Sequence, residues 1–116
     1  MLNQIILVGR LVEDLSVKRL EEGKKVGELI LAVQREFKNM DGQYDTDFIK
    51  CVCWDHLADS IEPFCKKGSL IAVKGRLQIK KTVVGETKLN MLELIAMRVI
   101  YLSLNKISAP DIEGSE

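Results

Sequence analysis

Aromatic and basic side chains alternate with small apolar ones between residues 47 and 54. Successive side chains of an extended strand point to opposite faces, so this segment divides into two faces of different chemistry. One face carries Phe48, Lys50, Val52 and Trp54, and the other carries Ile49, Cys51 and Cys53. Two large rings beside an ammonium group suit a surface that stacks nucleobases and neutralises phosphates.

The opposite assignment puts Phe48 and Trp54 in the core and turns the thiols outwards, because aromatic side chains are usually buried. Two observations argue against it. Lys50 shares the face of the rings and would be buried with them, and Ile and Cys are among the residues most often fully buried. We therefore predict that the face of the rings is the exposed one.

A second segment, residues 70–81, places basic side chains on one face of a strand. Lys74, Arg76 and Lys80 alternate with apolar residues there and could supply a track for phosphates. A solvated sheet face would show the same alternation, so this strand alone decides nothing. Together with the aromatic strand it predicts a nucleic-acid surface. To that surface we add three residues that lie near expected bends or loops: Arg10, Arg35 and Phe37.

The charge is unevenly distributed, although the 116-residue chain has 17 basic and 17 acidic residues. Residues 63–106 hold nine basic and two acidic residues, whereas residues 41–62 hold one basic and six acidic residues. A basic second half is a plausible footprint for a polyanion. The 13.1 kDa chain suffices for one domain, and its apolar runs are far shorter than the roughly 20 residues that span a bilayer.

Cys51, Cys53, His56 and Cys65 have side chains of the types that bind zinc. Structural zinc sites usually take ligands from turns, whereas Cys51 and Cys53 lie on the strand face assigned to the core, so we expect no metal site and no cofactor. No nucleophile has a neighbouring base in a recognisable motif, and the glycines form no phosphate-binding loop, so we expect no catalytic residues and no enzyme activity. An odd number of cysteines and no evident signal peptide favour a cytoplasmic protein with reduced thiols.

The order of the expected elements predicts an all-β fold. We expect strands at residues 5–12, 27–35, 47–54, 70–81 and 89–102, a long connection at 13–25 and a tight turn at Asp41-Gly42. A short helix should follow the third strand, with Asp55 as its N-cap and Pro63 shortening or kinking it. Five strands with one short helix after the third are typical of the oligonucleotide-binding (OB) barrel. The domain should cover residues 1–102, and residues 103–116 should form a short, disordered acidic tail.

Five blocks of sequence, in order and suitably spaced, resemble the bacterial single-stranded DNA-binding protein family. They are residues 7–11, 31–38, 46–54, 66–78 and 93–102. The resemblance implies an OB barrel, usually a homotetramer with a dimer as the alternative, that coats single-stranded DNA without sequence preference during replication, recombination and repair. It also implies a cytoplasmic, nucleoid-associated protein without catalysis. Base stacking is implied at the positions matched by Phe37, Phe48 and Trp54, and basic strand residues such as Lys50 are implied to line the DNA.

Two departures from the family pattern bear on the function. Thr82 stands where an aromatic residue is common after the fourth strand, so either the affinity per subunit is lower or Tyr44 partly replaces the missing ring. Residues 111–116 are acidic but lack the long linker and the terminal hydrophobic residue with which the family recruits partner proteins. Two other functions stay open, namely an OB-fold protein for RNA binding or replication restart and a protein-interaction module.

Overall fold

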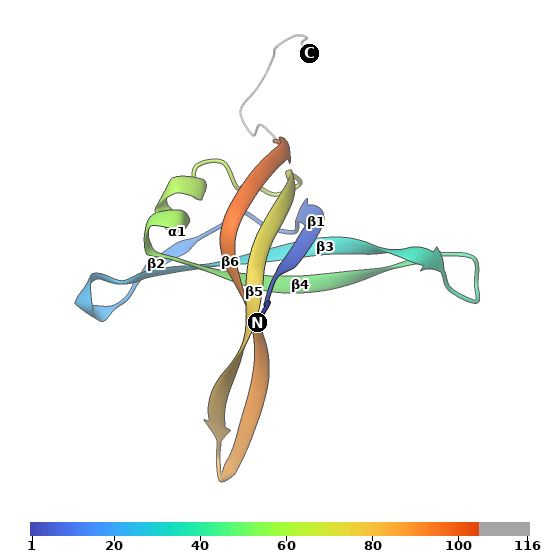
Figure 1. Cartoon of the computed structure of the whole chain (residues 1–116). Coiled ribbons are helices and arrows are strands. Elements are labelled where there is room, and N and C mark those ends of the chain that lie inside the picture. Colours follow the sequence, from blue (N-terminus) through green and yellow to red (C-terminus); the bar gives the residue numbers. More distant parts are fainter. Residues whose placement is uncertain (105–116) are drawn as a thin grey trace.

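The computed structural model describes residues 1–104 and shows a closed β-barrel with two long hairpin arms (Figure 1). Its strands are β1 (Ile5–Leu11), β2 (Val17–Arg19), β3 (Lys25–Lys38), β4 (Tyr44–Trp54), β5 (Leu70–Val84) and β6 (Thr87–Ser103). They pair in the order β1-β5-β6-β4-β3-β2, and a further pairing of β1 with β3 closes five of them into a barrel. Helix α1 (Asp55–Ile61) follows β4, and a 3₁₀ turn, η1 (Glu21–Gly23), separates β2 from β3. The predicted all-β, five-stranded OB fold with one short helix is confirmed for the described residues.

The barrel core consists of the alternate residues that the sequence assigned to it. Its fully buried strand residues are Leu29, Leu31, Cys51, Cys53, Ile71 and Val73. Ala58 and Ile61 of α1 and Cys65 beyond it belong to the same cluster. The thiol face of β4 is therefore the core face, and the alternative with buried rings is excluded.

Two glycines allow neighbouring strands of the barrel to approach closely. A Cβ atom at Gly9 of β1 would lie 2.6 Å from the carbonyl oxygen of Ala32, and one at Gly75 of β5 would lie 2.2 Å from that of Ile95. Gly75 also stands at a register shift between β5 and β6. Neither position has room for a methyl group, so the sequence needs glycine at both.

Two hairpins extend as arms beyond the barrel, the β3–β4 arm around the turn at residues 39–43 and the β5–β6 arm around the turn at residues 85–86 (Figure 1). Gly42 and Gly85 in these turns have φ values of +77° and +62°, which favour glycine. These strands are longer than the sequence predicted. Strand β3 continues to Lys38, β4 begins at Tyr44 and β5 continues to Val84. They are longer because the paired strands of an arm satisfy each other's backbone groups even where neither face is buried.

The start of the helix differs from the prediction. Trp54 occupies the N-cap position without a side-chain capping bond, so the expected N-cap role of Asp55 is wrong. Asp55 has a φ of +49°, and its Oδ1 accepts a hydrogen bond of 3.0 Å from the backbone N–H of Lys25. The carboxylate therefore ties the helix start to β3. Pro63 lies beyond the last helical residue, Ile61, and the helix is short as expected.

The connection expected at residues 13–25 contains secondary structure of its own. Strand β2 pairs antiparallel with β3, with Val17 opposite Gly27, and η1 follows it. Three residues of mixed polarity carry too little periodicity to be recognised as a strand in the sequence. Residues 105–116, which include most of the expected acidic tail, lie outside the described part of the chain. Within residues 1–104, no helix combines the length and the apolar character that crossing a membrane requires.

Candidate nucleic-acid interface

The ring-bearing face of β4 points away from the core, as predicted. Phe48 is 68% exposed and Trp54 is 38% exposed, and the side chain of Lys50 between them is also largely exposed. Phe48 and Trp54 are six residues apart on one strand, which corresponds to roughly 20 Å at about 3.3 Å per residue. The two rings are therefore separate contact points for a chain that follows β4.

Val52 is the exception on this face, because it is only 6% exposed. In the described residues β4 pairs with β6 at Cys51 and Val52, so Val52 has strands on both sides, with Glu28 of β3 opposite it and Ile95 of β6 next to it. Phe48 lies outside the paired stretch of β6 and stays open on that side. Alternation predicted the face correctly but not the cover that a third strand provides.

A groove of about 640 Å³ lies between β4 and the β5–β6 arm. It brings together three of the predicted residues, Phe48 and Lys50 from β4 and Lys80 from β5. Apolar side chains supply much of the remaining lining, and they are Ile5, Ile49, Val52, Leu77, Met91, Leu92 and Leu94. The groove thus combines an exposed ring, two ammonium groups and an apolar lining with the carboxylates of Glu28 and Glu93.

Thr82 also lines this groove, at the position where the family resemblance leads one to expect a ring. It lies opposite Leu89 of β6. Tyr44, which could partly replace the ring missing at position 82, lies on the β3–β4 arm. The ammonium of Lys38 is 5.8 Å from the centre of the Tyr44 ring. Tyr44 is not part of the groove lining, so within the groove Phe48 is the aromatic residue.

Lys74 and Arg76 lie on β5 but outside the groove. Lys74 is opposite Ile6 of β1 and Arg98 of β6, and it lies six residues before Lys80 on the same strand. Arg76 is opposite Ile95, the β6 neighbour of Val52, and its Nη1 donates a hydrogen bond of 2.8 Å to Oε1 of Gln78. Between Lys74 and Gly75 the register with β6 shifts, because Met97 of β6 has no partner on β5.

Arg10 shares a row of the sheet with Phe48. Arg10 of β1 lies opposite Ala32 of β3, which in turn lies opposite Phe48 of β4. Its Nη1 donates a hydrogen bond of 2.9 Å to the carbonyl oxygen of Gly68. A smaller hollow of about 400 Å³ separates Arg10 from the residues that precede Phe48 on β4, such as Thr46. Arg10 therefore flanks the ring of Phe48 from β1, the strand that closes the barrel against β3.

Arg35 and Phe37 lie on the β3–β4 arm. Phe37 is 81% exposed and belongs to β3, not to a loop as expected. The Nε and Nη2 atoms of Arg35 donate hydrogen bonds of 3.0 Å to the two carboxylate oxygens of Asp47, and Asp45 lies 3.8 Å from its Nη1. The hydrogen bond to Arg35 lowers the pKa of Asp47, and the same bond raises the pKa of Arg35. This guanidinium is thus already bound to carboxylates in the free protein.

The sequence missed the acidic partner of Lys50. The Nζ atom of Lys50 lies 3.6 Å from Oε2 of Glu28 on β3. Glu28 and Lys50 are 22 positions apart in the sequence, and the strand register expected from the turn between them does not bring them together. If the register is counted back from the pair Lys38 and Tyr44, Glu28 falls too far from Lys50 to contact it. An irregularity between Gln34 and Lys38 shifts the register and brings the two residues closer.

Comparison with known proteins shows the family to which this chain is related. Residues 2–102 match the single-strand binding protein family. The chain belongs to this family. It is 42% identical over 80 residues to single-stranded DNA-binding protein 1 of Lactococcus lactis, covering 69% of this chain and 53% of the relative. It is 39% identical over 103 residues to single-stranded DNA-binding protein 3 of Listeria innocua, covering 88% of this chain and 64% of that relative.

Solved structures of the single-strand binding family share the fold. A Plasmodium falciparum SSB in complex with single-stranded DNA superposes with a TM-score of 0.76 at 26% identity, covering 89% of this chain and 96% of that one. A deletion mutant of the single-stranded DNA binding protein from Thermus aquaticus gives a TM-score of 0.73 at 27% identity, covering 88% of this chain and 51% of that one. The family membership expected from the five sequence blocks is confirmed.

Proposed function

We propose that this chain binds single-stranded DNA without sequence preference and protects it during replication, recombination and repair. The groove that joins Phe48 to Lys50 and Lys80 is the main support for this function. The names of the bacterial relatives and the DNA complex of the Plasmodium falciparum structure support it further.

In the proposed mode, bases stack on the exposed rings of Phe48 and Trp54 while Lys50 and Lys80 contact phosphates. Stacking tolerates any sequence because every base has a π face, and it is worth about 1–3 kcal/mol per base. The phosphates are common to all sequences as well. Binding by these contacts sequesters the strand without making or breaking bonds, so we propose no catalytic activity.

The remaining predicted residues extend the proposed path on either side of the groove. Arg10 flanks Phe48 across the sheet, and Arg76 lies beyond Val52 on the far side of β6. Phe37 and Arg35 offer a contact on the β3–β4 arm. Lys74 meets the same strand of DNA if that strand continues across β5 towards β1.

We also propose a homotetramer in the bacterial cytoplasm, associated with the nucleoid. An apolar row crosses the outer face of the barrel, from the exposed Val8 of β1 over the half-buried Ala72 of β5 to the exposed Ile100 of β6. Exposed apolar surface of this kind suits contact with a second copy. Light scattering tests the assembly directly. A monomeric mass at micromolar concentration contradicts the proposed tetramer, and a dimeric mass shows an assembly of half that size.

A fluorescence titration tests the proposed function. Trp54 is the only tryptophan of the chain, so its emission reports on this face alone. We expect oligo-dT to quench the emission to a saturating level, and the affinity to fall as salt rises. Unchanged emission at saturation removes Trp54 from the interface. Weak, salt-insensitive binding points to a protein-interaction module, and a preference for poly-U over oligo-dT points to RNA.

A further inference from the structure

Glu28 stands in the middle of the proposed DNA path. It lies opposite Val52 in the β3–β4 register, and the neighbouring pairs are Ile30 with Lys50 and Val26 with Trp54. Glu28 is thus diagonal to both Lys50 and Trp54 on the outer face. A strand that stacks on Phe48 and on Trp54 has to pass the carboxylate of Glu28.

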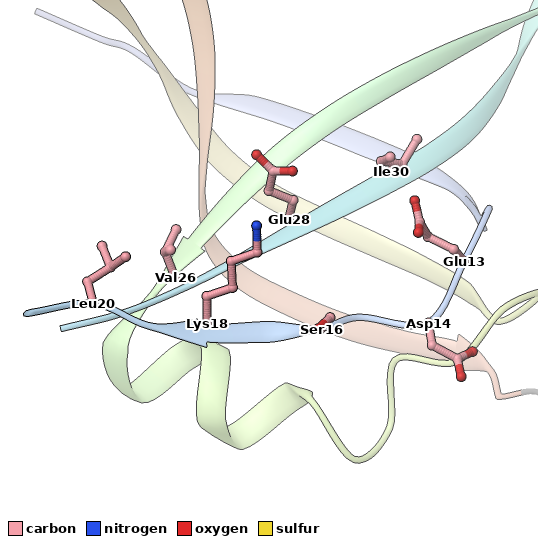
Figure 2. A pocket seen from close by; sticks show the side chains of 8 residues that line it. All are labelled: Glu13, Asp14, Ser16, Lys18, Leu20, Val26, Glu28 and Ile30. Carbon is pink, nitrogen blue, oxygen red and sulfur yellow. The ribbon is translucent and has the colours of Figure 1, made fainter. Parts of the chain in front are cut away.

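Glu28 also separates two hollows of the surface. On one side it lines the groove that contains Phe48 and Lys80. On the other side it lines a trough of about 350 Å³ between β2 and the outer face of β3. Figure 2 shows Glu28 projecting from β3 at this trough, with Lys18 reaching towards it from β2. The carboxylate therefore borders both hollows.

The contact between Glu28 and Lys50 is of the exchangeable kind. One oxygen lies 3.6 Å from the ammonium, and the two side chains are 58% and 59% exposed. Exposed ion pairs of this geometry contribute little to stability, because water screens them and two long side chains must be held in place. Arg35 differs, since it donates two hydrogen bonds of 3.0 Å to Asp47. Lys50 can leave its carboxylate for a phosphate more readily than Arg35 can.

We propose that Glu28 is an affinity-setting counter-ion, which holds Lys50 in the free protein and releases it to a phosphate when single-stranded DNA binds. The inference rests on the proposed function, because it concerns the same interface. Glu28 weakens binding in two ways. Lys50 must give up its partner, and the partner then remains as a like charge beside the phosphate.

The same exchange makes binding less sensitive to salt. Each phosphate that a cation neutralises releases condensed counter-ions and adds about −0.7 to the salt slope for single strands. When Lys50 moves to the phosphate, the freed carboxylate of Glu28 attracts a cation from solution and offsets part of that release. The salt slope should then be smaller than the number of contacting cations implies.

The test measures oligo-dT affinity at several salt concentrations for the full chain and its Glu28→Gln variant. We expect a two- to fivefold lower Kd for Glu28→Gln and a salt slope steeper by up to about 0.7. Glu21→Gln is the matched control, because it removes one exposed carboxylate on η1, outside both hollows. Thermal unfolding of each variant verifies that it is folded.

A double-mutant cycle isolates the pair. Lys50→Gln should weaken binding less in the wild-type background than in the Glu28→Gln background, where Lys50 has no competing partner. If Glu28→Gln behaves like Glu21→Gln, or if the cycle shows no coupling, the counter-ion role is wrong while the proposed function stands. A wild-type chain that does not bind oligo-dT overturns the proposed function and this inference with it.

Discussion

Phe48 of β4 lies directly opposite Ala32 of β3, and its ring remains 68% exposed. A methyl group is too small to cover a phenyl ring, and β6 does not pair with β4 at this position. The ring therefore stands free above the sheet at the edge of the groove. Its exposure follows from the register and not from a local irregularity of the strand.

We expect Phe48→Ala to weaken oligo-dT binding by about 1–3 kcal/mol, because the variant loses one stacking platform. The unfolding midpoint in urea should stay close to that of the wild type, because an exposed ring contributes little to the core. A fluorescence titration on Trp54 measures the affinity.

Phe64→Ala is the matched control for Phe48→Ala. Phe64 is also an exposed phenylalanine, but it packs against Tyr101 with ring centres 5.5 Å apart and does not line the groove. Its removal should leave the affinity unchanged. Equal losses for the two variants would show that Phe48 does not stack on DNA.

A ring at position 82 should strengthen binding. Thr82 lines the groove that also contains Phe48 and Lys80, so Thr82→Phe adds a second platform within it. The expected gain lies towards the lower end of about 1–3 kcal/mol per stacked base, because the added ring also buries apolar surface in the free protein. Thr87→Phe, at the far end of the same arm, is the control and should give no gain. A Thr82→Phe variant with unaltered affinity places the DNA path elsewhere.

Lys80 and Lys74 should differ although they are equivalent in the sequence pattern. Lys80 lines the groove, whereas Lys74 lies opposite Ile6 on another part of the barrel. With an oligonucleotide short enough to occupy only the groove, Lys80→Gln should weaken binding and reduce the salt slope by about 0.7. Lys74→Gln should change neither quantity. The reverse order would assign the β1–β5 side to the primary contact.

The contrast between these two lysines shows which features of the site can be predicted from the sequence. Alternation sorts residues into two faces, and it placed the thiols inside and Phe48 and Trp54 outside correctly. It cannot tell where around a closed barrel an outer face points, because that depends on which strands pair. It also cannot see register irregularities, such as the one between Gln34 and Lys38, which brings Glu28 closer to Lys50.

Gly75→Ala should destabilise the barrel strongly. The new Cβ would meet the carbonyl oxygen of Ile95 at 2.2 Å, and a backbone atom cannot move aside without breaking the β5–β6 pairing. We expect a loss of about 1–3 kcal/mol or more in the free energy of unfolding, measured with urea. Ala96→Gly, next to Ile95 on the opposite strand, removes a methyl group without adding a clash and should cost less. An unchanged urea midpoint for Gly75→Ala would show that the strands can separate at this point.

The buried thiols make the stability depend on alkaline pH. Cys51, Cys53 and Cys65 are fully buried, and burial raises the pKa of each thiol from an ordinary 9.0 to about 11. Between these values the unfolded chain loses thiol protons that the folded chain keeps. The free energy of unfolding should therefore be constant with respect to these groups below pH 9 and fall as the pH rises towards 11.

Urea unfolding at pH 8, 9 and 10 measures this fall, and Cys51→Ala provides the comparison. The variant is less stable at every pH because of its cavity, but its stability should decline less steeply above pH 9, since one shifted thiol is gone. At pH 8 the native wild type should also react slowly with an aromatic disulfide reagent, at a rate set by opening of the barrel. Rapid reaction of the folded protein, or equal pH slopes for wild type and variant, would contradict the raised pKa of Cys51.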